Sequence, residues 1–199
     1  ALAAESVWDP DGGRRFVVAD EALGIARAEG DPEVLADVLL HRSVAVASPD
    51  TLGERTELAH ELDLLAATLG DDRVVVWSAL HLWRVACESG DAERADAAIE
   101  RATTRAAALR IPQLAWASAL DRAAHELVRG DLARAEHEAR AALAAGTRLG
   151  HPDASVWFAS QLLAVRRAQG RSVEALAGIS TVTPAGAPGP GDPGLVALA

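Results

Sequence analysis

The sequence predicts an all-α fold, a two-layer solenoid of antiparallel helix pairs with a repeat of about 40 residues. Three observations predict it. Glycine recurs on a grid of 20 residues, at positions 30, 70, 90, 130, 150 and 170. Half of the residues are apolar, largely Ala, Leu and Val, and Ala and Leu are strong helix formers. Two kinds of helical segment, which differ in how their apolar residues are spaced, alternate along the chain.

The grid places one helix between each pair of breaks. Helices are expected over residues 14–29, 32–47, 51–69, 72–89, 91–109, 112–129, 131–149, 152–169 and 171–179. A glycine supplies the left-handed conformation that ends a helix, and a following aspartate can accept hydrogen bonds from the free amides of the next helix. The pairs Gly90-Asp91 and Gly130-Asp131 are typical of this break, and Asp71-Asp72 is interpreted as a cap.

Proline marks the other junctions. At three of them a proline lies two residues after the grid position, where it can begin the next helix without losing a hydrogen bond: Pro32, Pro112 and Pro152. The two grid positions that lack glycine are Asp50 and Arg110, and each has a proline within two residues.

The two helix types predict two layers. In 91–109 the apolar residues form one stripe, Ala95, Ala98, Ala102, Ala106 and Leu109, and 131–149 repeats it with Ala135, Ala139, Ala142, Gly146 and Leu149. Such helices contact the core on one side and belong to an outer layer. In 72–89 nearly every residue from Val74 to Cys87 is apolar, which indicates an enclosed helix of the inner layer.

The two ends differ from the repeat domain, which is expected over residues 14–180. Residues 1–13 are interpreted as the remnant of a preceding helix and a turn. Residues 181–199 are rich in Pro and Gly and are expected to be an extended or disordered tail. Because neither end shows a polar capping helix, excision from a larger protein is the interpretation.

The outer-helix spacing resembles the tetratricopeptide repeat, in which a glycine is followed by alanine five and twelve residues later. The matching positions are Gly90, Ala95 and Ala102, then Gly130, Ala135 and Ala142, then Gly170 and Ala175. The repeat here is longer than the usual 34 residues. Seven positions before each glycine, where the family has a small residue, stand Trp83, Ala123 and Leu163. The resemblance implies a right-handed, TPR-like solenoid.

Longer repeats of this kind resemble the C-terminal helical regions of large bacterial, especially actinobacterial, regulators of the LuxR type that carry a STAND-class ATPase. Segments 69–72, 130–136 and 148–153 carry this likeness, which covers roughly residues 14–175. It implies a sensor or scaffold that binds an inducer, a partner protein or a neighbouring ATPase domain.

Composition excludes several classes of site. The net charge of −10, with all 19 cations being Arg and spread along the chain, argues against a nucleic-acid surface. Since the chain has no lysine, it has no phosphate-binding loop of the Gly-x-x-x-x-Gly-Lys type. No cofactor is expected, the single Cys87 is interpreted as a buried small apolar residue, and a cytoplasmic protein without a membrane span is expected.

Four polar residues occupy one position in successive inner-layer helices, 40 residues apart: His41, His81, Asp121 and Gln161. Equivalent positions of a solenoid line up across neighbouring helices. The row is therefore a wetted strip on the concave side, a set of contacts for a peptide or small ligand, or, least favoured, a metal site formed by the two histidines.

The tryptophans allow two interpretations as well. Trp77 and Trp157 share a repeat position, Trp116 is one residue off it, and Trp83 lies a turn and a half beyond Trp77. They are either core residues or an aromatic groove that anchors a partner. The charged groups around His125-Glu126 and 136–138 are interpreted as solvated surface.

The function predicted from the sequence is a non-catalytic helical repeat module of a bacterial transcriptional or signalling regulator. It would bind a protein partner, a peptide or a small-molecule inducer on its concave face, with His41, His81, Asp121, Gln161, Trp77 and Trp157 as contacts. The alternatives are a stand-alone structural adaptor or a small helical enzyme in which His41, His81 and Asp121 act as acid–base groups.

Overall fold

The computed structural model describes residues 12–171, with side chains from Arg14 onward. The expected N-terminal remnant lies outside this range except for its last two residues, and so do the expected helix 171–179, except for its first residue, and the Pro/Gly-rich tail. Within residues 12–171 all regular structure is helical and no strand occurs, which confirms the all-α prediction. None of the helices in this range is long and apolar enough to cross a membrane.

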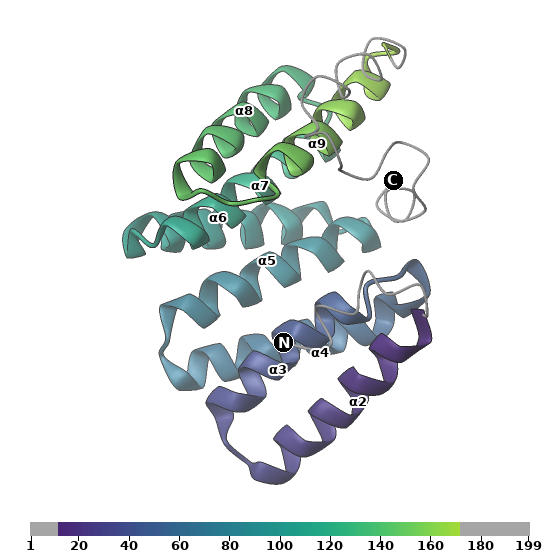
Figure 1. The fold of residues 1–199 in the computed structure, drawn as a ribbon, viewed down its shortest axis with the longest axis vertical. Coiled ribbons are helices and arrows are strands. Elements are labelled where there is room, and N and C mark those ends of the chain that lie inside the picture. The colour runs from purple at the N-terminus through teal and green to yellow at the C-terminus, as the bar shows by residue number, and fades with distance from the viewer. Residues whose placement is uncertain (1–11, 172–199) are drawn as a thin grey trace. The chain divides into compact units, whose positions relative to one another are not determined.

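The helices follow the predicted grid closely (Figure 1). Their bounds are α2 Gly12–Glu29, α3 Pro32–Ala45, α4 Leu52–Leu69, α5 Asp72–Ser89, α6 Ala92–Leu109, α7 Pro112–Val128, α8 Leu132–Leu149 and α9 Ala154–Ala168, with a short 3₁₀ turn, η2, at Pro49–Thr51. Three bounds differ from the prediction by two residues, the others by at most one. Helix α2 begins at Gly12 rather than at residue 14. Helix α3 stops at Ala45 because the chain turns before Pro49, which has no amide hydrogen, and α9 begins two residues after Pro152.

The helix breaks work as the sequence predicts. All six grid glycines have a positive φ, between 64° and 83°. Asp71 accepts a hydrogen bond from the Arg73 amide at 2.8 Å, and Asp131 accepts one from the Arg134 amide at 3.0 Å. At the grid position that lacks glycine before Pro112, Arg110 adopts the same left-handed conformation, with a φ of 53°.

The chain divides into two compact units. Unit 1 ends at Leu109 and unit 2 begins at Arg110. In unit 1 each helix from α2 to α6 packs against the next, and α3 also contacts α5. In unit 2, α7 packs against α8, α8 against α9, and α7 also contacts α9.

The small-residue stripes lie where the pattern predicts. In α6 the buried residues are Ala95, Ala98, Ile99, Ala102 and Ala106, and in α8 they are Ala135, Ala139, Ala142 and Gly146. The last member of each predicted stripe is less buried, because Leu109 is half-buried and Leu149 is exposed. Helix α5 is largely enclosed, with Val76, Leu80 and Trp83 among its buried residues. Small side chains let α6 approach α5, and α8 approach α7, closely.

Candidate functional site

The two histidines of the predicted row have different environments. His41 on α3 is half-exposed, and its Nδ1 lies 2.8 Å from the carbonyl oxygen of Asp37. His81 on α5 is only 7% exposed. Burial, followed by the positive charges of Arg84 and Arg55, lowers the pKa of His81 to about 3. His81 is therefore an uncharged side chain at neutral pH.

The other two members of the row lie in unit 2. Gln161 on α9 reaches α7, where its Nε2 donates a hydrogen bond of 2.7 Å to the carbonyl oxygen of Leu120. This bond places Gln161 against the backbone next to Asp121, which is half-buried. The structure thus brings Gln161 close to Asp121, whereas no hydrogen bond or ion pair within the described range joins His41 to His81.

The tryptophans divide between core and surface. Trp83 and Trp116 are buried, Trp77 is half-buried, and Trp157 on α9 is 40% exposed. The Trp116 ring stacks on His151 with 3.9 Å between ring centroids. The core interpretation fits Trp83 and Trp116 but not Trp157.

Two smaller expectations need correction. His125 and Glu126 on α7 were expected on a solvated face, yet both are buried. Glu126 is paired with Arg122 at 3.1 Å and with Arg134 at 3.3 Å, so its charge is compensated. Arg122 one turn before Glu126 was the available signal for this arrangement. Cys87 is half-buried rather than fully enclosed.

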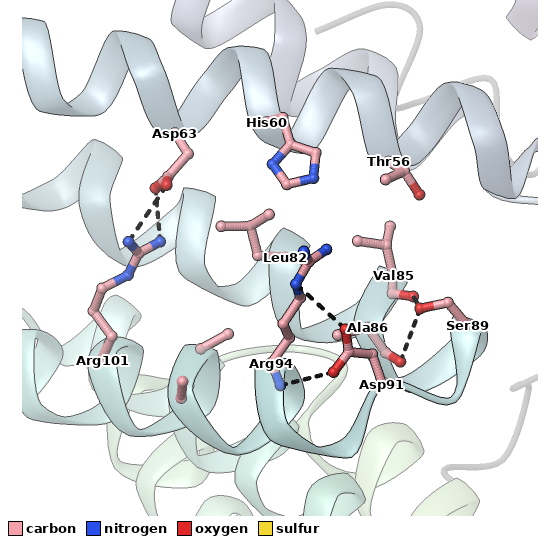
Figure 2. Close-up of a pocket in the computed structure, with 12 residues that line it drawn as sticks. Thr56, His60, Asp63, Leu82, Val85, Ala86, Ser89, Asp91, Arg94 and Arg101 are labelled. Atoms are coloured by element: carbon pink, nitrogen blue, oxygen red, sulfur yellow. Dashed lines mark hydrogen bonds and ion pairs between the residues drawn. The ribbon is translucent and has the colours of Figure 1, made fainter.

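A pocket of about 550 Å³ opens in unit 1 over α5, between α4 and α6 (Figure 2). Its apolar floor is formed by α5 and the near side of α6. The lining residues are Thr56, His60, Asp63, Leu82, Val85, Ala86, Ser89, Asp91, Arg94, Ala97, Ala98 and Arg101. Polar groups line its two walls and both of its ends, so the pocket combines an apolar floor with a charged rim.

One end of the pocket is closed by an ion pair. Arg101 on α6 donates to Asp63 on α4, with 2.6 Å between Nη2 and Oδ1. Asp63 also accepts a hydrogen bond of 3.0 Å from the Oγ of Ser78, which lies buried in α5. Three consecutive helices are thus tied together at this end, and Asp63 has its charge offset inside unit 1.

The opposite end is formed by the start of α6. Asp91 Oδ1 accepts the Arg94 amide at 3.1 Å, and Asp91 Oδ2 lies 3.3 Å from Arg94 Nε. The Arg94 side chain, 73% exposed, extends from α6 toward His60 on α4, as Figure 2 shows. His60 is exposed on the opposite wall of the pocket.

None of the six residues predicted to bind a ligand lines this pocket. Asp63, Arg94 and Arg101 could not be singled out from the sequence, because each lies on the polar face of α4 or α6, where charge is ordinarily solvated. A usable signal was the pair of opposite charges on α4 and α6, with Asp63 and Arg101 38 residues apart.

A metal centre receives no support from residues 12–171, since these contain no group of three or more His, Cys, Asp or Glu side chains that could hold an ion. Comparison with known proteins adds no family, because no family model and no curated protein matches the chain.

Proposed function

We propose that this chain is a non-catalytic binding module and that the pocket over α5 is its ligand site. The observation that carries the proposal is the pocket itself. Its volume of about 550 Å³ is within the usual range for small-ligand sites, and it has the apolar floor with a few fixed polar groups that such sites share.

The module is proposed to be a right-handed, TPR-like solenoid with two layers. Two hairpins support this, α5–α6 in unit 1 and α7–α8 in unit 2. Each joins a more enclosed helix to a helix with a stripe of small buried residues, and each has a Gly-Asp break between its helices. The contacts of α3 with α5 and of α7 with α9 are those expected between neighbouring inner helices.

The parent protein is proposed to be a cytoplasmic bacterial regulator in which this module is the sensor or scaffold. Ligand binding between α4 and α6 would favour one spacing of these helices and so transmit occupancy to whatever the module contacts. His41 and Trp157, both accessible, remain our candidates for contacts with a protein partner.

The enzymatic alternative is less well supported. It requires His81 to exchange protons with a substrate, but His81 is buried and has a pKa of about 3, far from the value that suits acid–base work near neutral pH. Asp121, its proposed partner, belongs to the other unit.

Screening the full chain for thermal stabilisation by a metabolite library tests the binding function. Ala97, an exposed residue that lines the pocket, is replaced by Trp to fill the site. Ala107, exposed on the same helix outside the pocket, is replaced by Trp as the matched control. Compounds that stabilise wild type and Ala107→Trp but not Ala97→Trp would support the proposal. A library without any such compound would contradict it.

The coding sequence on either side of this segment tests the proposal that the parent protein is a regulator. An in-frame ATPase or helix-turn-helix domain is the expected finding. A flanking sequence that encodes a metabolic enzyme, with neither an ATPase nor a helix-turn-helix domain, would argue for a different role.

A further inference from the structure

Two side chains that can donate hydrogen bonds, a histidine and an arginine, point toward each other across the pocket from separate helices. His60 comes from α4 and Arg94 from α6, and Leu82 on α5 lies on the floor near them (Figure 2). Because the two helices meet through α5, the two side chains are held on opposite walls of one cavity.

Their hydrogen-bonding capacity is largely unused inside unit 1. Among the described residues only Asp91 pairs with the Arg94 side chain, and it does so through Nε. The two terminal nitrogens of Arg94 therefore remain available as a planar fork of donors. No described residue forms a hydrogen bond with the ring of His60, which can donate from one nitrogen when neutral and from both when protonated.

The other charges of the pocket are already compensated. Asp63 is engaged by Arg101 and by Ser78. Asp91 is engaged by the backbone amide and Nε of Arg94. An incoming anion would consequently find free donors on the terminal nitrogens of Arg94 and on His60, with Asp91 as the carboxylate that competes for Arg94. It would not have to break the Asp63–Arg101 pair.

Next to these donors the floor is apolar. Leu82, Val85 and Ala86 from α5 continue into Ala97 and Ala98 from α6. A ligand that places a charged head between Arg94 and His60 can therefore bury a hydrocarbon portion along α5.

We infer that the pocket binds a small organic acid, with its carboxylate held between Arg94 and His60 and an apolar tail on Leu82, Val85 and Ala86. This inference rests on the proposed function, which it narrows to one ligand class. A free acid is favoured over a peptide because the Asp63–Arg101 pair closes one end of the pocket and limits the length of its occupant.

Calorimetric titration of the full chain with octanoate, and with octanol as the uncharged analogue, tests the ligand class. Octanoate should bind at least about tenfold more tightly than octanol, since a charge-assisted hydrogen bond contributes more than a neutral one. Equal affinities for the acid and the alcohol would overturn the inference, as would failure of octanoate to bind.

Three variants test the residues. Arg94→Gln should weaken octanoate binding about tenfold or more. Asp91→Asn keeps a side chain that can cap α6 but removes the nearest negative charge, so it should strengthen binding. Arg105→Gln on the same helix is the control, because Arg105 is exposed, pairs with Asp72 at 3.2 Å and does not line the pocket. Arg94→Gln and Arg105→Gln having equal effects would refute the role of Arg94.

A tetrapeptide with an acetylated N-terminus, an apolar sequence and a free C-terminal carboxylate tests whether the carboxylate belongs to a small acid or to a peptide. Weaker binding than octanoate is expected, and tighter binding by the peptide would overturn the small-acid assignment. The library screen with Ala97→Trp is independent of these results. If only neutral compounds stabilise wild type and not Ala97→Trp, and octanoate does not bind, the binding function is supported and the carboxylate inference is wrong.

Discussion

Gly146 on α8 lies against a side chain that leaves no room for growth. A Cβ added there would sit 2.5 Å from Trp116 Nε1 and 2.7 Å from the Cβ of Ala154. The ring of Trp116, buried and stacked on His151, cannot retreat easily. At this position the missing side chain is thus part of the packing between α8 and its neighbours.

Gly146→Ala should therefore destabilise the protein by about 1–3 kcal/mol, despite the better helix propensity of alanine. Gly24→Ala on α2 is the matched control, because nothing lies within 4 Å of its added Cβ, and a gain of about 0.5–1 kcal/mol is expected there. Urea unfolding followed by circular dichroism measures both. A stabilised Gly146→Ala variant would mean that the Trp116 ring can move.

His81 connects burial to pH. Its pKa is lowered in the folded state to about 3, first by burial and then by Arg84 and Arg55, from an ordinary value of 6.5. The unfolded chain therefore binds more protons between these two pH values. The contribution of His81 to the unfolding free energy is fully present above pH 6.5 and is lost progressively as the pH drops toward 3.

Lowering the pH from 8 to 5 should cost about 2 kcal/mol of unfolding free energy through His81 alone. Replacing it by Gln should remove this part of the pH dependence, whereas His41→Gln, at a half-exposed site, should leave it in place. Denaturant titrations at the two pH values measure the difference. Identical pH slopes for wild type and His81→Gln would show that His81 does not carry the effect.

At the scale of elements, the end of α6 shows a helix break made without glycine. Arg110 has a φ of 53°, a conformation that costs an L-amino acid about 1–2 kcal/mol. The regular spacing of helix breaks therefore reflects a repeated backbone conformation rather than a repeated residue, because Arg110 adopts the left-handed conformation where glycine is missing.

Arg110→Gly should raise stability by about 1 kcal/mol by relieving this conformation. Arg129→Gly is the control, because Arg129 at the end of α7 has a φ of −70°, and glycine there should be neutral or destabilising. Thermal unfolding distinguishes them. Equal shifts in Tm for both variants would contradict the account of Arg110.

Helices α4 and α5 are joined by a buried cation. Both terminal nitrogens of Arg55 donate to the Glu88 carboxylate, one at 2.6 Å, and Nη2 also donates to the Ser48 carbonyl oxygen at 3.0 Å. This bonding raises the pKa of Arg55, which stays charged although it is buried. Its partner is therefore essential in a way that a surface partner is not.

Glu88→Ala should destabilise the protein by about 1–3 kcal/mol, because the Arg55 charge loses its main acceptor. The exposed pair of Arg27 and Glu61, 2.8 Å apart, supplies the control, and Glu61→Ala should cost less than about 1 kcal/mol. Chemical denaturation compares the two. Equal losses of unfolding free energy in Glu88→Ala and Glu61→Ala would show that water can replace Glu88 as the partner of Arg55.

At the scale of the whole molecule, the charge bears on whether the chain can bind nucleic acid. The net charge is −10, and arginines on several helices are paired with carboxylates, including Arg101 with Asp63, Arg105 with Asp72 and Arg166 with Glu136. A carboxylate partner offsets the charge of each of these arginines and so weakens its attraction to a phosphate backbone.

The full chain should therefore fail to shift a labelled DNA duplex at micromolar concentration and about 0.15 M salt. A purified helix-turn-helix protein that binds this duplex serves as the positive control in the same gel. A shift that weakens steeply with added salt would reveal a phosphate-binding surface and contradict this expectation.

Helix bounds could be predicted well from the sequence because they depend on local chemistry. Asp131 caps the helix that follows it, and Gly90 ends the helix before it, as expected from neighbours a few residues away. The stripe from Ala95 to Ala106 was likewise predicted from helical spacing alone. All of these features need only the geometry of a single helix.

The pocket could not be predicted in the same way. It exists because α4 and α6 leave part of α5 uncovered, and because Arg101 happens to reach Asp63 across that interval. Both facts depend on the packing of three helices. The burial of Glu126 was missed for a related reason, since its second partner, Arg134, comes from the next helix.

The alanine rows of α6 and α8 restrict how these two hairpins can change over generations. A methyl group at Ala102 or Ala142 already fills its space, so nearly every heavier replacement there would wedge two helices apart. The solvent sides of the same helices carry no such restriction. Homologous sequences should accordingly vary on the solvent-exposed faces of α6 and α8, and should keep small residues at the buried positions of these two helices.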